Sequence, residues 1–108
     1  MTPINRQFRP HNSLDDFKQA VIADDGRVVF GKKSQDEMFE NGLSPEQFGK
    51  HVNALRPRDF NDSQTHVNDH RRWIDSYIFV HDGVDWYMKF HPRFDGPGYF
   101  VQKCHPSR

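Results

Sequence analysis

The second half of the chain carries side chains that are suited to acid–base chemistry. Histidine can take up or release a proton near neutral pH, and the chain has seven histidines. Four of them lie in or beside segments with strand-like patterning: His66, His70, His91 and His105. Tyr87 could donate a proton or stack on a base. Basic residues that could hold a phosphate group stand nearby: Arg71, Arg72, Lys89 and Arg93.

This set of residues fits cleavage of RNA without a metal ion. Such a reaction needs a base that takes the proton of the 2′-hydroxyl and an acid that protonates the leaving oxygen. It also needs a cation that stabilises the charged phosphorane. The candidate catalytic residues are Tyr87, Lys89, His70 and His105. The candidates for RNA binding are Arg71, Arg72 and Arg93.

Each of these residues also has a structural interpretation. His70 can be a buried histidine that is hydrogen-bonded to a neighbouring carboxylate, either Asp69 or Asp75. His91 and His105 also fit the exposed ends of strands. Tyr87 and Lys89 fit a solvated sheet face, and Arg71 and Arg72 fit a surface pair.

A metal site is the weaker chemical interpretation. Zinc prefers four ligands from cysteine and histidine, and Cys104, His105 and His91 would approach one another if their strands paired. His66 and His70 are four residues apart and would share one side of a helix. With a single cysteine and no C-x-x-C pattern, the sequence predicts no metal or other cofactor.

Length and charge limit the class of protein. The chain has 108 residues, which fits one domain, 1–108, with a modest core. Lysine and arginine together number 15, as do aspartate and glutamate, so the net charge is zero. A general nucleic-acid-binding protein needs clustered basic residues. The composition therefore leaves room only for a local basic pocket.

The chain carries no feature of an exported or membrane protein. Its one cysteine cannot form a disulfide within the chain, which suits a reducing compartment. No apolar run approaches the length of a membrane span, and residues 1–11 lack the apolar part of a signal peptide. We therefore expect a cytoplasmic protein with no membrane partner.

The first half of the chain has helical patterning. Residues 1–12 are expected to be irregular, and Ser13 can cap a helix over Leu14–Ala23. Residues 27–30 fit either a short strand or an extended link. A second, short helix is expected behind Ser34 as its N-cap.

A third helix has the strongest start signal in the chain. Ser44 fits the N-cap, Pro45 fits the first helical position and Gln47 completes a capping box. Pro57 is expected to end this helix. The polar segment that follows, residues 59–70, is expected to form a short helix or an ordered loop.

The last third of the chain has strand patterning. Three strands are expected over 73–80, 84–90 and 99–104, separated by turns that contain glycine. In the middle strand, apolar and polar residues alternate, so Trp86, Met88 and Phe90 face the core. Tyr87 and Lys89 then lie on the other face. The predicted fold is α+β, with N-terminal helices packed on a three-stranded antiparallel sheet.

Residues 59–77 contain an uncommon pattern, Asp-His-x-x-Trp-x-Asp-x-Tyr, which begins at Asp69. A glycine turn at Gly83 and a strand with Tyr87 and Lys89 follow it. This part of the chain resembles the MqsR family of bacterial toxins, the motility quorum-sensing regulators. The run matches the family pattern without a gap at Phe60, Ser63, Thr65, Asp69, His70, Trp73, Asp75 and Tyr77.

The resemblance implies a RelE-like fold and a type II toxin that cuts messenger RNA without a metal. It also implies a partner, an antitoxin that is encoded nearby. Activity in the family depends on a lysine, a glutamine, a tyrosine and a C-terminal lysine. The first two positions hold Asp62 and Ile74 here, and the tyrosine is kept as Tyr87. The position of the C-terminal lysine falls near Cys104 or His105. Asp62 thus reverses the charge of a catalytic cation.

Three hypotheses of function follow. The leading one is a metal-independent mRNA endoribonuclease, the toxin of a type II toxin–antitoxin system, in which histidines replace the lost lysine and glutamine. The alternative keeps the fold without catalysis, as a protein that binds a regulator or a phage or host factor. Zero net charge and the residues Asp62 and Ile74 favour this alternative. The third is a metal-dependent protein that uses the histidines.

Overall fold

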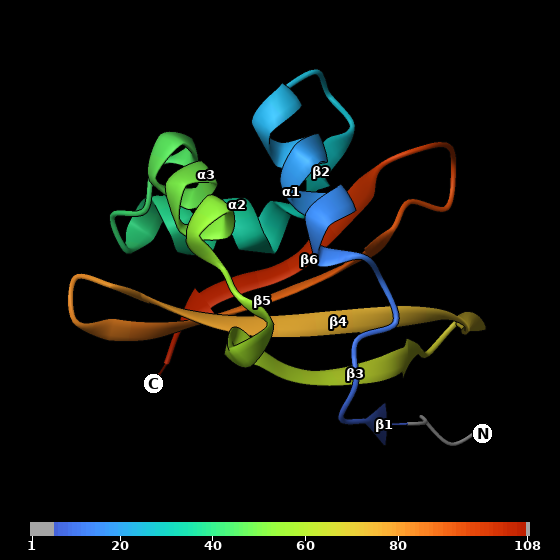
Figure 1. Ribbon diagram of the computed structural model, residues 1–108. Helices are drawn as coiled ribbons and strands as arrows, with labels where there is room; N and C mark the ends of the chain where they lie inside the picture. The colour runs from blue at the N-terminus through green and yellow to red at the C-terminus, as the bar shows by residue number, and fades with distance from the viewer. Residues whose placement is uncertain (1–5, 108) are drawn as a thin grey trace.

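The computed structural model describes residues 6–107, without the side chains of Arg6 and His70. Three α-helices lie on one side of a mixed β-sheet in this part of the chain (Figure 1). The helices are α1 (Leu14–Ala23), α2 (Lys32–Glu40) and α3 (Pro45–Ala54). The strands are β1 (Arg6–Gln7), β2 (Val28–Phe30), β3 (Phe60–His66), β4 (Asp69–His81), β5 (Val84–Pro92) and β6 (Tyr99–Pro106). None of these helices is long and apolar enough to cross a membrane.

The first and third helices begin where the sequence predicts. The Ser13 hydroxyl accepts the backbone N–H of Asp16 at the start of α1. At α3, the Ser44 hydroxyl accepts the N–H of Gln47, whose side chain accepts the N–H of Ser44 in return. These reciprocal bonds satisfy two donors that a helix start leaves without intrahelical partners.

The second helix starts earlier than expected. Its N-cap is Gly31, not Ser34, which lies inside α2 and is buried. The Ser34 hydroxyl donates to the carbonyl of Val101 in β6, so it anchors the helix to the sheet. The third helix also ends early, at Ala54, and Pro57 instead opens a 3₁₀ turn over Pro57–Asp59.

The sheet is larger than the predicted three-stranded meander. Its six described strands have the order β1-β3-β4-β5-β6-β2. The three expected strands form the antiparallel centre, β4, β5 and β6. Residues 6 and 7, expected to be irregular, pair with β3, and residues 1–5 lie outside the described part. Residues 28–30 are a strand, parallel to β6. The α+β class is therefore confirmed, but the sheet is mixed.

The prediction of a helix or loop over residues 59–70 was wrong, because this segment forms β3 and the start of β4. It lacks apolar alternation because polar side chains occupy both faces of β3. Ser63 donates to Asp75 at 2.6 Å, and Asp62 accepts the Ser76 hydroxyl at 2.6 Å. Hydrogen bonds to β4 thus replace the apolar burial that usually marks a strand in a sequence.

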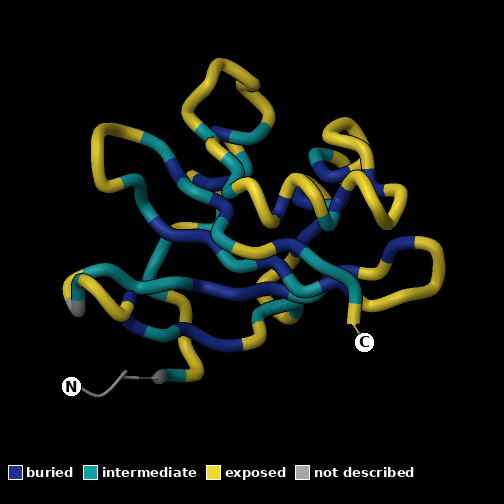
Figure 2. Tube along the Cα trace, turned by 180° about the vertical axis from the view of Figure 1, so that it is seen from behind, coloured by how far each residue is buried: buried dark blue, intermediate teal, exposed yellow. Residues whose placement is uncertain are grey.

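The hydrophobic core lies between the helices and one face of the sheet. Phe17 of α1 stacks on Phe90 of β5 with ring centroids 3.8 Å apart. Trp86, Met88 and Phe90 are all buried, as the alternation in β5 predicts. The opposite face of the sheet has no helix over it in the described structure (Figure 1). Figure 2 shows that exposed residues are concentrated in the turns and along parts of the helices.

Candidate functional site

A row of polar residues crosses four strands on the face of the sheet that lies away from the helices. Asp62 in β3 pairs with Ser76 in β4, Ser76 with Lys89 in β5, and Lys89 with Lys103 in β6. Residues that pair directly across neighbouring strands share a face. Two lysines therefore stand side by side on this face, which we call the open face.

Tyr87 and His105 form the next pair along β5 and β6. Their rings are 5.9 Å apart between centroids, and both side chains are half-buried. The Nδ1 of His105 lies 3.0 Å from the carbonyl oxygen of Pro106. A carbonyl only accepts, so Nδ1 carries the proton of the neutral ring. The Nε2 of His105 is then left with a lone pair that can accept a proton.

Asp62, which the resemblance places at the position of a family lysine, is buried at 3% exposure. One carboxylate oxygen accepts the Ser76 hydroxyl, and the other accepts the side-chain amide of Gln64 at 3.1 Å. Gln64 in turn pairs with Ile74, the residue at the family's glutamine position. Both departures from the family pattern thus lie on the open face, Ile74 in β4 next to the strand of Lys89 and Asp62 one strand further away in β3.

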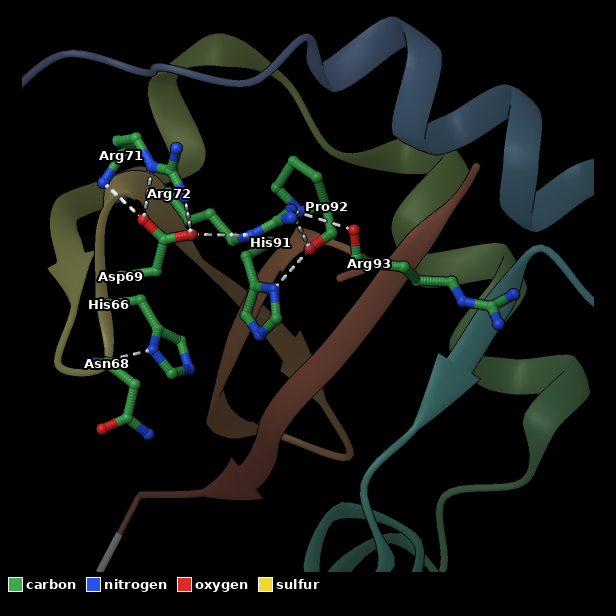
Figure 3. Close-up of polar contacts among 8 residues, drawn as sticks. All are labelled: His66, Asn68, Asp69, Arg71, Arg72, His91, Pro92 and Arg93. Carbon is green, nitrogen blue, oxygen red and sulfur yellow. Dashed lines mark hydrogen bonds and ion pairs between the residues drawn. The ribbon is translucent and has the colours of Figure 1, made fainter. Parts of the chain in front are cut away.

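The predicted RNA-binding arginines are engaged in other contacts. Arg71, at the exposed end of the sheet, pairs with Asp69 at 3.1 Å, and this hydrogen bond lowers the pKa of that carboxyl group. Arg72 donates to the carbonyl of Arg93 at 2.9 Å (Figure 3). Its guanidinium also lies over the ring of Phe94. Arg93 extends away from them and pairs with Asp95.

Two further candidates are placed differently from the sequence prediction. His66 and His70 cannot share a helix, because they lie on β3 and β4. The side chain of His70 is outside the described part, so its catalytic or structural role stays a prediction. His91 was expected to be an exposed strand end, but it is 2% exposed.

The residues proposed for a metal site do not converge. Cys104 is buried in the core on the helix side of the sheet, whereas its neighbour His105 lies on the open face with Tyr87. Burial raises the pKa of the Cys104 thiol to about 12. No cluster of three metal-binding side chains occurs among the described residues. The thiol is therefore protonated at neutral pH and positioned for packing.

The pattern that carries the family resemblance has a structural role. The carboxylate of Asp75, fully buried, accepts the backbone N–H groups of His11 and Asn12. The Trp73 ring stacks on His11 with centroids 3.7 Å apart. Tyr77 is buried in the core, and burial raises its pKa to about 12. These residues fix the lead-in to α1 against β4, on the side of the helices.

Sequence reasoning missed Lys103 and the burial of His66 and His91. Lys103 was missed because the pairing of β5 with β6 shifts in register between Lys89 and Phe90, and this shift changes which β6 residues share a face with β5. The burial of His66 and His91 depends on Phe94 and Phe100, which approach the histidines only in the folded sheet. The lysine and tyrosine pattern of β5 was the available signal for this face.

The fold and the site define a small α+β protein with one sheet face covered by helices and the other carrying tyrosine, histidine and lysine. Residues 9–102 match the family described as motility quorum-sensing regulator, toxin of MqsA. Because this match covers most of the chain, the protein belongs to the MqsR family of toxins. A comparison with curated proteins gives no match.

Proposed function

We propose that this toxin is a metal-independent endoribonuclease that cuts messenger RNA on the open face of its sheet. The observation that carries the proposal is the pairing of Tyr87 with His105 beside the pair Lys89 and Lys103. A proton acceptor, a hydroxyl donor and two cations are thereby gathered within two neighbouring strands. The reaction would take place in the cytoplasm, where the protein encounters messenger RNA.

The chemistry follows from the placement of these groups. Nε2 of His105 takes the proton of the ribose 2′-hydroxyl, and the 2′-oxygen attacks the adjacent phosphorus. The bond from phosphorus to the 5′-oxygen then breaks, and the Tyr87 hydroxyl gives its proton to that oxygen. The products are a 2′,3′-cyclic phosphate and a free 5′-hydroxyl. Lys89 and Lys103 stabilise the charge on the phosphorane.

Asp62 has a different role from the family lysine in this scheme. Its carboxylate lies two strands from Lys89, a backbone separation of about 10 Å at ordinary strand spacing. We assign to it the orientation of the polar row through Ser76, to which it is hydrogen-bonded. The cation that stabilises the transition state is supplied from β5 and β6 instead.

Incubation of the purified protein with single-stranded RNA in excess EDTA tests the proposed function. Cleavage that leaves 2′,3′-cyclic phosphate ends is expected. Replacing the nucleotide before the cut by its 2′-deoxy form should abolish that cut, because the attacking oxygen is gone. Intact RNA in EDTA, or cleavage of the 2′-deoxy position, would remove the assignment.

A partner antitoxin of the MqsA kind follows from the family, and its expression should neutralise the protein. Expression of the chain alone should then arrest growth, and co-expression of the neighbouring gene should restore it. The alternative, a binding protein without catalysis, is favoured by the buried acid at Asp62 in place of a cation. A protein of that kind should bind its partner but leave RNA intact and cause no arrest.

A further inference from the structure

A hollow of about 430 Å³ lies at the end of the sheet where β5 turns into β6. This volume falls within the range of small-molecule binding sites, roughly 300–1,000 Å³. Two strands and the turn supply most of the lining, which includes His66, His91, Phe94, Phe100 and Gln102. The proposed reaction does not use any of these five residues.

The two histidines present different hydrogen-bonding groups to the hollow. Nδ1 of His66 accepts the backbone N–H of Asn68 at 3.0 Å, so the proton of the neutral ring is on Nε2 (Figure 3). Nδ1 of His91 instead donates to the carbonyl of Pro92 at 2.7 Å, which leaves a lone pair on Nε2. Burial lowers the pKa of His91 and favours this neutral form.

The hydrogen bonds of both rings within the described residues are made by Nδ1, and neither Nε2 atom has a hydrogen-bond partner among those residues. Both residues are largely buried, His66 at 8% and His91 at 2% exposure, and both line the hollow. The hollow therefore offers one N–H donor, from His66, and one nitrogen acceptor, from His91. A nucleobase edge displays donors and acceptors side by side and can satisfy both.

The walls of the hollow are aromatic and held in place. Phe94 is 53% exposed, yet the guanidinium of Arg72 lies 4.3 Å from its ring centroid. Arg72 also donates to the carbonyl of Arg93, the residue before Phe94, so the turn is fixed. Phe100 lies against Gly31, where an added Cβ would be only 3.2 Å from its ring.

The hollow adjoins the proposed cleavage site. His91 follows Lys89 by two residues in β5, and Gln102 precedes Lys103 in β6. At about 3.4 Å per residue, His91 is roughly 7 Å from Lys89 along the strand. A strand of RNA held by the two lysines would place a neighbouring nucleotide at the hollow.

We propose that the hollow binds one unstacked base of single-stranded RNA, next to the phosphate that is cut. The proposal rests on the proposed ribonuclease function, and it adds the element that selects the cleavage sequence. The base lies against the aromatic walls, accepts from Nε2–H of His66 and donates to Nε2 of His91. Single-stranded RNA is read in this way in many proteins, by stacking on aromatic rings and by bonds to the base edges.

Titration with the four nucleoside 5′-monophosphates, followed by NMR of the histidine rings, tests the proposal without any cleavage. At least one nucleotide should shift the His66 and His91 ring signals, and ribose 5-phosphate should not. Phe94→Ala should weaken that binding roughly 5- to 150-fold, the range for losing one stacked base. Phe39→Ala is the matched control, because Phe39 is an 88% exposed phenylalanine on α2, outside the hollow.

The outcomes separate the hollow from the ribonuclease function. Nucleotide binding at the two histidines without RNA cleavage would leave the hollow as a base-binding site and remove the ribonuclease function. Cleavage with an unchanged rate and sequence preference in Phe94→Ala would overturn the base site alone. An equal response to ribose 5-phosphate, or no shift of either ring with any nucleotide, would also overturn it.

Discussion

The carboxylate of Asp75 in β4 accepts the backbone N–H of Asn12 at 2.8 Å, although the two residues are 63 positions apart in the sequence. The same carboxylate accepts the N–H of His11 and the hydroxyl of Ser63. One buried acid thus joins the segment before α1, strand β3 and strand β4. The family pattern around Asp75 accordingly maintains the fold, and the proposed chemistry is assigned to the open face.

Asp75→Ala should therefore be strongly destabilising. It leaves two backbone donors and a hydroxyl group without their acceptor in a buried site, at a cost of about 2–5 kcal/mol in the free energy of unfolding. Urea denaturation of the variant and of wild type measures this difference. Asp85→Ala, which removes an exposed carboxylate from β5, should change the value by less than about 0.5 kcal/mol. Equal effects of the two changes would contradict the assigned role.

Stability should fall in mild acid because of a histidine pair between α3 and β4. Nε2 of His51 lies 3.0 Å from Nδ1 of His81, and His51 stacks on Phe79. Burial lowers the pKa of His51, and the neighbouring His81 lowers it further. The unfolded chain therefore binds the proton more readily than the folded protein does. The contribution of neutral His51 to the free energy of unfolding is complete above about pH 6.5 and is lost as the pH decreases toward the lowered pKa of the folded state.

Urea midpoints between pH 7.5 and pH 5 measure this effect. His51→Gln should flatten the decrease, whereas Lys50→Gln, an adjacent change at an exposed position of α3, should keep it. Some decrease should persist in His51→Gln because burial also lowers the pKa of His91. A pH dependence of His51→Gln that is as steep as that of wild type would show that the pair does not contribute.

Cys104 should be unreactive in the folded protein. Its side chain is 1% exposed, and burial raises the thiol pKa to about 12. At pH 8 a reagent therefore cannot reach the sulfur, and the thiol is not ionised to the reactive thiolate. A chromogenic disulfide reagent should modify it slowly in buffer and rapidly in concentrated urea. Equally fast modification in both would place the thiol at the surface and contradict its position in the core.

Local signals in the sequence predicted the helices and the centre of the sheet. The reciprocal caps of Ser44 and Gln47 involve neighbouring residues, and the alternation over 84–90 reports one buried face. Strand β3 was missed because Asp62 and Ser63 are stabilised by partners in β4, and hydrogen bonds across strands leave no periodicity. The parallel pairing of β2 with β6 joins residues about 70 positions apart, beyond any local pattern.

The candidate site was predicted only in part for the same reason. Tyr87 and Lys89 follow from the alternation in one strand, but the pairing of Lys89 with Lys103 depends on an irregular register between two strands. Arg72 was assigned to phosphate from its charge alone. Its guanidinium is committed to the turn after β5, where it contacts Phe94 and the carbonyl of Arg93.

The rate of RNA cleavage in EDTA by Tyr87→Phe and by His105→Ala tests the proposed open-face site most directly. Each change removes one proton-transfer group, so each should lower the rate by roughly 10²–10⁴-fold. Both variants should keep the unfolding midpoint of wild type, and Lys50→Ala on α3 should cleave at the wild-type rate. Wild-type cleavage that survives in both Tyr87→Phe and His105→Ala would contradict a catalytic site on this face.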